Sequence, residues 1–377
     1  GEMSQQEPSK ILPPHSTEVL DIDQTERNPL SRKNRLRKES WGLVLRRTWS
    51  DYFLEGLGDR GAAMTYFTLM AFAPTVLAVY SIATLLFANR KQEVEQLTRQ
   101  LIQDYLPQDV SAQATDIVNT IIGSSAKGTI ALVLSVLVSL FSASGYVRAF
   151  SRTANMVYGR VEGRGLLRTW AMMWVLTIFL VVGAVILVFA NLLRDTVITG
   201  LIEPVSRPLH LESAVDFLLR IFLPVWNWLR FPVTVVMVMV LIAVLYHYAP
   251  NVRSPRFRWI TLGSVVTLLV NVVVWWLFGL YLRHFAGVSA YGALSTVLAL
   301  FVALWIMNTV LILGLKLDAE VLRAKELQIG LESQHYIQAA PRSDVAARAQ
   351  AKTQKNLEAR GDAILRHGAE DGGDAED

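Results

Sequence analysis

Six long apolar stretches, each free of Asp, Glu, Lys and Arg, constrain this chain more than any other feature of its sequence. A helix rises 1.5 Å per residue, so about 20 apolar residues cross the roughly 30 Å hydrocarbon core of a membrane. Only helices and closed barrels satisfy their own backbone in lipid. We therefore predict an all-α, polytopic membrane protein with six transmembrane helices. The predicted spans are residues 62–88, 129–147, 169–193, 231–248, 259–282 and 291–315.

The distribution of basic residues between the spans predicts the orientation. Nineteen Lys and Arg lie in one set of segments, 32–60, 148–168, 249–258 and 316–325. Nine lie in the other set, 89–128, 194–230 and 283–290. Because basic loops stay in the cytoplasm, we expect both termini there. The expected location is the inner membrane of a bacterium.

Two segments outside the membrane are expected to carry little structure. Residues 1–40 are polar and basic and are predicted to be a disordered N-terminal tail, and residues 328–377 a disordered cytoplasmic tail with some nascent helix. Between the two lies the transmembrane domain, residues 41–327. The chain has no cysteine, which excludes a thiol nucleophile and a cysteine-based zinc site.

Three further helices are predicted outside the spans. Residues 41–57 have apolar residues at helical spacing with arginines between them, which fits either a helix on an anionic membrane surface or a packed juxtamembrane helix. Residues 91–122 read as an external helical hairpin. Residues 209–230 read as another external helix, interfacial or re-entrant. The fourth span is expected to begin just after Pro232, a favourable first residue of a helix.

Polar and small residues within the spans mark a candidate substrate path. Ala131, Ser135, Ser139 and Ala143 repeat every four residues, a pattern that packs helices closely or leaves a narrow polar path. The amides in spans five and six need protein partners, as interhelical bonds or as substrate contacts. Pro74 removes one hydrogen bond from the first span and predicts a kink. The candidate path comprises Tyr66, Pro74, Ser135, Ser139, Ser142, Asn271 and Asn308.

The charged groups nearest to the membrane interior lie at the ends of the spans, and none lies within a span. Proton-driven carriers usually keep ionisable groups inside the membrane, so a proton relay at the midplane is not expected. Arginine-rich ends and a weakly polar middle suit an amphipathic anion such as a phospholipid. The candidate cytoplasmic mouth comprises Arg148, Arg152, Asn155, Tyr158, Tyr246, Asn251, Lys316 and Asp318.

Nothing in the sequence indicates an enzyme. The six histidines are isolated from one another, with no metal-ligand spacing, and no nucleotide-binding fingerprint or nucleophile motif occurs. The serines in the spans have no embedded His, Lys or Asp to activate them. We expect no catalysis, no metal and no cofactor.

Four motifs, in order along residues 45–325, resemble those of the YihY/virulence factor BrkB family. They are Ala62-Ala63-Met64-Thr65-Tyr66-Phe67 running to Ala73-Pro74, Phe141-Ser142-Ala143-Ser144-Gly145 followed by Asn155-Met156-Val157-Tyr158-Gly159, Leu245-Tyr246-His247-Tyr248-Ala249-Pro250-Asn251, and Ala290-Tyr291-Gly292 with Trp305 and Gly314. One position departs from the family, whose Gly-x-Glu-x-Asn is Gly314-Leu315-Lys316-Leu317-Asp318 in this chain. A role of the family's acidic residue would rest on Asp318.

The resemblance implies an inner-membrane protein of a group formerly labelled ribonuclease BN and linked to virulence, with one branch associated with export of lipid-A-type molecules. Our leading hypothesis is a transporter or flippase-like permease for a lipid or amphipathic anion. The alternative is a non-catalytic membrane scaffold of the envelope, and a membrane-bound ribonuclease ranks last. The expected partners are membrane lipids, above all anionic ones, and a second copy or an envelope protein, but no nucleic acid.

Overall fold

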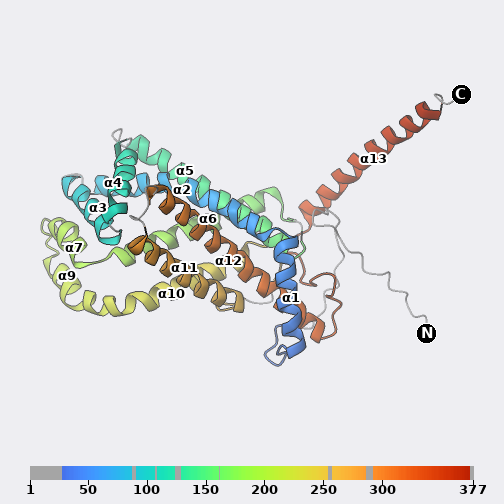
Figure 1. Ribbon diagram of the computed structural model, residues 1–377, viewed down its shortest axis with the longest axis horizontal. Coiled ribbons are helices and arrows are strands. Elements are labelled where there is room, and N and C mark those ends of the chain that lie inside the picture. Colours follow the sequence, from blue (N-terminus) through green and yellow to red (C-terminus); the bar gives the residue numbers. More distant parts are fainter. Residues whose placement is uncertain are drawn as a thin grey trace.

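The computed structural model of the chain describes residues 28–86, 91–106, 108–123, 129–160, 162–253, 257–285 and 292–373. Every regular element in these residues is a helix, and six are long and apolar enough to cross a membrane, which confirms the predicted fold class and span number. The long helices form an elongated bundle (Figure 1). Helix α1 (Lys38–Leu54) crosses one end, called the α1 end below, while α3, α4, α7 and α9 lie at the opposite end.

The spanning segments agree with the predicted ranges to within a few residues at most of their ends. The six helices are α2 (Leu57–Leu86), α5 (Thr129–Val157), α6 (Leu166–Leu192), α10 (Leu223–Tyr248), α11 (Leu262–His284) and α12 (Gly292–Gln328). Helices α5 and α12 run well beyond the predicted ends at residues 147 and 315. Their extra turns carry polar and charged residues, which the criterion of an uncharged span excludes but which pack against other protein at the α1 end.

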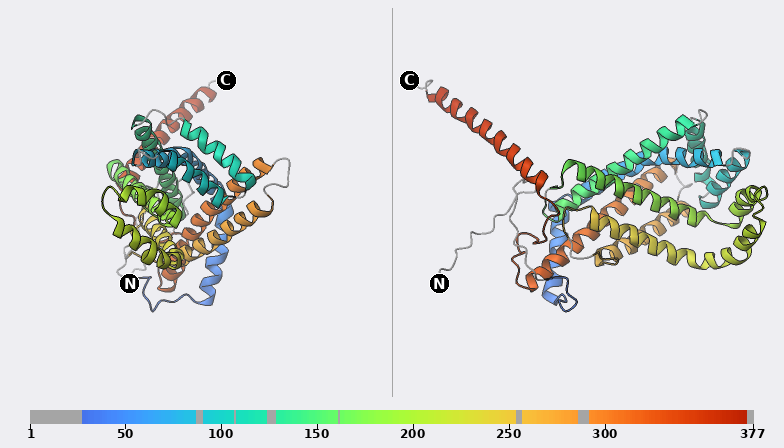
Figure 2. Two further views of the ribbon diagram at one scale, coloured as in Figure 1. Left: turned by 90° about the vertical axis from the view of Figure 1, so that its left-hand side faces the viewer. Right: turned by 180° about the vertical axis from the view of Figure 1, so that it is seen from behind.

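The predicted external hairpin corresponds to α3 (Lys91–Tyr105) and α4 (Gln108–Gly123), which pack on each other and on α2. Figure 2 shows both helices at the end of the bundle away from α1. Val94 of α3 is almost fully buried.

The segment before the fourth span differs from the prediction. Residues 209–230 do not form a separate external helix, because one apolar helical segment runs continuously from Glu212 to Tyr248. It consists of α9 (Glu212–Phe217), the π-helix η3 (Leu218–Phe222) and α10, with Pro232 inside α10 rather than at its start. A proline removes one hydrogen bond and bends a helix without ending it where helix-forming residues continue on both sides. Short turns α7 (Asp195–Val197), η2 (Ile198–Ile202) and α8 (Glu203–Ser206) precede this segment.

The main core lies in the half of the bundle nearer α1. Phe150 of α5 stacks on Tyr246 of α10 with ring centroids 6.1 Å apart, and both pack in one cluster with residues of α2, α6 and α12. One buried amide within this core bonds to two neighbouring helices. The Asn308 side chain donates to Thr65 Oγ1 (3.0 Å) and accepts from the Tyr146 hydroxyl (2.9 Å), so it joins α2, α5 and α12. Among the two roles open to Asn308, the structure gives it the interhelical one.

Helices α11 and α12 approach each other at glycines. A Cβ atom placed on Gly263 would lie only 1.9 Å from the carbonyl oxygen of Gly314. We expect Gly263→Ala to destabilise the protein by about 2 kcal/mol or more, because the two backbones must separate. Gly279→Ala in the same helix is the matched control, since a Cβ there meets nothing within 4 Å. The control should be neutral or slightly stabilising. Thermal unfolding in detergent checks both, and equal melting temperatures would contradict the close contact.

Both segments predicted as tails differ in part from that prediction. Residues 1–27 lie outside the described residues, but residues 28–37 pack on the end of α12. Asn34 donates to the Lys325 carbonyl oxygen (3.0 Å). On the C-terminal side, residues 331–344 pack against the α1 end, and α13 (Val345–Gly373) is a long helix that projects from the bundle (Figure 1). Composition indicated few apolar residues but could not show that backbone groups of 331–344 bind loop side chains.

Candidate functional site

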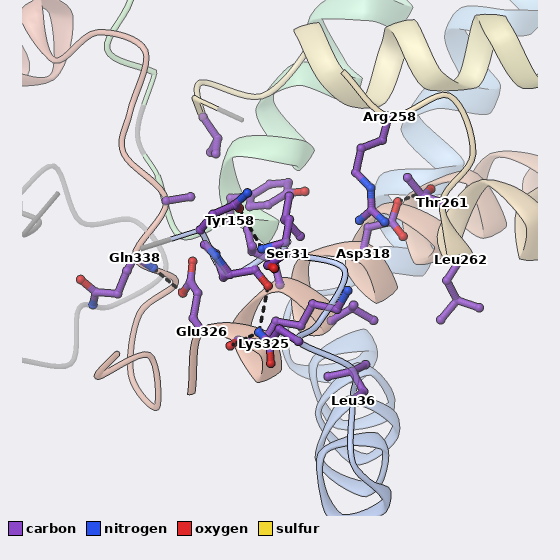
Figure 3. Close-up of a pocket in the computed structure, with 18 of the residues that line it drawn as sticks. Ser31, Leu36, Tyr158, Arg258, Thr261, Leu262, Asp318, Lys325, Glu326 and Gln338 are labelled. Carbon is purple, nitrogen blue, oxygen red and sulfur yellow. Dashed lines mark hydrogen bonds between the residues drawn. The ribbon is translucent and has the colours of Figure 1, made fainter. Parts of the chain in front are cut away.

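A cavity of about 760 Å³ lies at the α1 end. Its walls come from residues 28–41, the end of α10, the loop that leads to α11, the end of α12 and residues 331–340. Three members of the predicted mouth line it, Tyr158, Tyr246 and Asp318. Figure 3 shows side chains from these segments converging on one space. Three of the eight residues predicted for the mouth thus lie at a hollow site.

Basic side chains predominate on the cavity wall. Its cationic groups are Arg32, Arg35, Arg253, Arg258 and Lys325, and its acidic groups are Asp318 and Glu326. In the described part of the chain, none of the five cations takes part in an ion pair. The cavity thus has positive charge available for an anion.

Both acidic groups are occupied by structural hydrogen bonds. Asp318 accepts from Thr261 Oγ1 (2.6 Å) and from the Gly263 N–H (2.8 Å), so it holds the N-terminus of α11. Glu326 accepts from Ser333 Oγ (2.6 Å) and from the Gln338 N–H (2.9 Å), and it holds the segment that follows α12. Because these carboxylates are engaged, they compete weakly for the arginines. Arg258 points toward Asp318 (Figure 3).

Apolar residues border the cavity on its outer side. Trp41 and Leu262 line it and are each 39% exposed. Trp259 and Ile260, next to Leu262 in the chain, are more exposed still. In a membrane, such residues lie against lipid. The cavity therefore combines cationic groups with an apolar edge, as an amphipathic anion requires.

The segment that covers the cavity is fastened by one glutamine. The Gln328 amide accepts from Ser40 Oγ (2.6 Å) and the Arg37 N–H (3.0 Å), and it donates to Asn34 Oδ1 (2.9 Å) and the Arg35 carbonyl oxygen (2.8 Å). These four bonds join the end of α12 to residues 34–40. They fix the N-terminal wall of the cavity.

Helix α1 has two different faces. Val44 and Thr48 are buried against the bundle, while Leu45, Trp49 and Phe53 are more than 60% exposed. Figure 1 shows the helix lying across the bundle rather than along it. The structure thus combines the two alternatives for this segment, because one face packs on protein and the other presents aromatic residues suited to a membrane surface.

A buried arginine that was not among the predicted mouth residues holds the fold together beside the cavity. Arg164, which is 1% exposed, binds both carboxylate oxygens of Glu162 (2.7 and 2.8 Å) and donates to the carbonyl oxygens of Tyr248 (3.1 Å) and Ala249 (2.8 Å). We call this arrangement the Arg164 clasp. Burial alone would raise the pKa of Glu162, but the hydrogen bond and charge of Arg164 lower it below its usual value.

Two amides from the motifs, Asn155 and Asn251, extend the clasp in space. Asn155 donates to Glu162 Oε2 (3.0 Å) and accepts from the Asn251 N–H (2.6 Å). The Asn251 side chain donates to the Ser343 carbonyl oxygen (2.9 Å). Asn155 and Asn251 therefore connect α5, the end of α10 and the C-terminal segment, and neither lines the cavity.

Lys316 is the centre of a second polar arrangement. Its ammonium group lies 2.7 Å from Asp51 and 2.9 Å from Glu320, and it is 1% exposed. Arg47 and Arg323 flank these acids, at 3.5 Å from Asp51 and 3.0 Å from Glu320. Together with Glu55 we call these groups the Lys316 cluster, which fastens α1 to α12. The departure from the family pattern at this position thus places a cation in the protein interior rather than at a cavity.

The last two mouth residues lie on the outer side of α5. Arg148 donates to the Ser144 carbonyl oxygen (3.3 Å) and lies over the Phe141 ring, 5.5 Å from its centroid. Arg152 is exposed and close to Arg148 and Arg60, whose charges repel it. Both arginines are separate from the cavity lining.

None of the candidate path residues is among the residues that line this cavity. Tyr66 is 58% exposed on α2, and Thr75, next to Pro74, donates to Ser139 Oγ (3.5 Å) across the contact of α2 with α5. Ser135 is buried and Ser142 half-buried on α5. Asn271 on α11 has a buried side-chain oxygen that receives no hydrogen bond from the described residues. The serines therefore mark a helix contact more clearly than a path.

Sequence reasoning missed several groups that now define the site. Arg258 and Lys325 were counted only as loop charges, and Arg164 and Glu320 were not singled out. The Lys316 cluster had a detectable signal, because Arg47 and Asp51 are four residues apart, as are Lys316 and Glu320, and such pairs share a helix face. The spacing of Arg164 and Glu162 does not show that Arg164 is buried, since its other acceptors, the carbonyl oxygens of Tyr248 and Ala249, come from the distant end of α10. No group of three metal-ligating residues occurs among the described residues.

Comparison with known proteins agrees with the motifs. A family profile described as "Virulence factor BrkB" matches residues 48–335. The ribonuclease-like protein YfkH of Bacillus subtilis is 23% identical over 286 residues, which cover 75% of this chain and 96% of YfkH. No solved structure matches the chain at a significant level. Because the matched region spans α2 to α12 and most of the cavity wall, the chain belongs to the virulence factor BrkB family.

Proposed function

We propose that this membrane protein is a transporter, a flippase-like permease for a lipid or another amphipathic anion, and that the cavity at the α1 end binds the anionic head of its substrate. The observation that carries this proposal is the set of five cations without ion-pair partners in one cavity. Arginine binds phosphate and carboxylate in a bidentate manner, which suits a lipid head group.

The size and border of the cavity support the same substrate class. A volume of about 760 Å³ is typical of small-molecule sites, and it suits a head group with the first part of its chains. Trp41 and Leu262 provide an apolar edge along which acyl chains can lie. A soluble anion would gain nothing from that edge, so an amphipathic one is favoured.

The distribution of basic residues supports one orientation of this site in the membrane. The α1 end carries the basic segments, and basic segments stay in the cytoplasm. We therefore propose that the cavity faces the cytoplasmic leaflet of a bacterial inner membrane, whose anionic lipids attract basic segments. The substrate would enter from that leaflet.

A second candidate function rests on α13. This helix projects from the bundle (Figure 1), and Ile364 and Leu365 are both more than 70% exposed. A projecting helix with exposed apolar residues is a surface for an envelope protein or a second copy, as a scaffold requires. A chain ending before Val345 separates the two functions, because a permease keeps translocation without α13 and a scaffold loses its partner.

We propose that the chain is not an enzyme. The name of YfkH describes that protein as ribonuclease-like. Hydrolysis of RNA needs metal ligands or an acid–base pair. The two acids of the cavity are instead engaged as fixed hydrogen-bond acceptors for Thr261, Gly263, Ser333 and Gln338. Nucleic acid is accordingly not proposed as a partner.

Lipid translocation in liposomes tests the proposed function. The purified protein is reconstituted with a fluorescent phosphatidylglycerol or phosphatidylcholine, and a membrane-impermeant quencher reports which leaflet holds the label. We expect protein-dependent translocation of the anionic lipid. Arg258→Gln with Lys325→Gln should slow it about tenfold or more at low lipid content, because two charge-assisted contacts are lost.

Arg283→Gln combined with Arg220→Gln is the matched control, because both arginines are exposed and both lie toward the opposite end of the bundle. It makes the same change in net charge and should leave translocation unchanged. Vesicles indistinguishable from empty ones would contradict a passive permease. An equal loss of translocation in the control variant would contradict the assignment of the cavity as the site that binds the lipid head group.

A further inference from the structure

Three carboxylates surround a single buried ammonium group in the Lys316 cluster. Asp51 and Glu320 lie within hydrogen-bonding distance of Lys316 Nζ, at 2.7 and 2.9 Å. Glu55 is the third, and its nearer oxygen is 3.7 Å away. The ammonium group therefore contacts two carboxylates at close range and leaves Glu55 with a weak contact.

The remaining environment of Glu55 also disfavours a negative charge. Its Oε2 atom is buried and receives no hydrogen bond from the described residues. Glu55 is the C-cap residue of α1, where the helix dipole places partial negative charge. Gly56, with φ of +62°, ends the helix directly after it and fixes this position. An anion at this site is thus unfavourable for three independent reasons.

The charged groups that act on Glu55 come from both packed helices. Asp51 and Arg47 belong to α1, and Lys316 and Glu320 to α12. Burial raises the pKa of Glu55 to about 7, Lys316 and Arg47 oppose this rise, and Asp51 and Glu320 add to it. The shift agrees with the geometry, which by itself identifies Glu55 as the carboxylate without a full partner.

We propose that Glu55 is a proton-binding site of this protein, and that release of its proton loosens α1 from α12. A neutral Glu55 adds no buried charge between the two helices. An ionised Glu55 places a third carboxylate beside Asp51 and Glu320, which favours separation of α1 from the bundle. The proton thus acts as a ligand of the closed contact between these helices.

The contact between α1 and α12 affects the cavity directly. Trp41 of α1 lines the cavity, and residues 28–37 directly before α1 form one of its walls. A looser α1 therefore widens the cavity entrance, and a proton at Glu55 keeps it closed. This coupling concerns α1 and does not depend on the identity of the transported substrate, so it stands or falls separately from the proposed function.

The sign of the pH dependence follows from the raised pKa. A carboxyl group whose pKa is higher in the folded than in the unfolded protein stabilises the fold. This stabilisation is complete at pH values below the pKa of the unfolded protein. That stabilisation is lost as the pH rises through the folded value, about 7. Between pH 6 and 8 the melting temperature of the full-length protein in nanodiscs should fall by about 3 °C. Glu55→Gln should remove the part of this fall that is centred near pH 7.

The experiment adds a direct measure of the helix contact. The chain has no cysteine, so Leu45→Cys on α1 and Leu298→Cys on α12, both exposed, can carry spin labels without background. Double electron–electron resonance measures the distance between them across pH 6 to 8. We expect a distribution that broadens with a midpoint near pH 7, and one that stays narrow with Glu55→Gln.

Glu39→Gln, at an exposed position in the first turn of α1, is the matched control and should behave as the unmodified protein. A melting temperature and a distance that do not titrate, or a Glu55→Gln protein that titrates like the parent, would overturn the proton site. A titrating melting temperature with an unchanged distance would overturn the loosening of α1.

Discussion

Replacing Lys316 with methionine should destabilise the folded protein by about 3 kcal/mol or more, the largest effect that we expect from one substitution. The side chain is 1% exposed and is the closest cation to Asp51. Without it, Asp51 and Glu320 keep only the flanking contacts to Arg47 and Arg323. Two buried carboxylates would then face each other with too little positive charge. Reversible unfolding in mixed micelles, followed by circular dichroism, measures the loss.

A rescue variant separates charge from packing. Lys316→Met combined with Asp51→Asn and Glu320→Gln removes the cation together with its two closest acids. Because replacing a whole buried ion network by neutral groups is often nearly neutral, this triple variant should recover most of the lost stability. A triple variant as unstable as the single one would show that Lys316 acts through packing and would contradict the electrostatic account.

Replacing Arg164 with methionine is expected to have the second largest effect, again about 3 kcal/mol. The change leaves Glu162 without its bidentate partner and removes the Arg164 donor from two carbonyl oxygens inside the protein. The carbonyl oxygen of Tyr248 loses this bond, and that of Ala249 keeps only the bond from the Ser151 hydroxyl. The stability of Arg164→Lys should fall between that of the unmodified protein and that of Arg164→Met, because a lysine keeps the charge but cannot bind all three acceptors in one plane.

Arg168→Met is the matched control for the clasp, since Arg168 is exposed and lies four residues away. It should change the melting temperature by less than about 1 °C. Limited proteolysis adds a local measure, because release of the clasp should expose residues 331–344 to cleavage before the bundle unfolds. If residues 331–344 are as protected from cleavage in Arg164→Met as in the unmodified protein, the Arg164 clasp does not fasten this segment.

The membrane architecture could be predicted because it depends on local properties. A run of about twenty consecutive apolar residues predicts a transmembrane helix. The Asn308 amide in such a helix needs a hydrogen-bond partner nearby. The structure gives it two, Thr65 and Tyr146. The ends of the helices could be predicted less accurately from the sequence. Lys316 ends an apolar run by composition, yet its helix continues because Asp51 and Glu320 compensate the charge.

The candidate site was only partly predictable. Tyr158, Tyr246 and Asp318 were placed at a mouth because they end spans, and the cavity does gather them. Arg258 and Lys325 are separated by more than sixty residues, so no sequence window shows that they face the same space. The N-terminal wall depends on four hydrogen bonds of Gln328 to a segment almost 300 residues earlier in the chain. Such contacts are set by tertiary packing.

Photolabelling with a phosphatidylglycerol that carries a diazirine near its head group tests most directly whether the cavity binds an anionic amphiphile. After irradiation of the protein in nanodiscs, mass spectrometry maps the labelled peptides. We predict labelling concentrated on residues 257–262 and 318–326. Unlabelled phosphatidylglycerol, but not phosphatidylcholine, should compete with this labelling, and Arg258→Gln with Lys325→Gln should reduce it. Labels spread evenly over the lipid-facing surfaces of α5, α6 and α11, with equal competition by both lipids, would contradict the account.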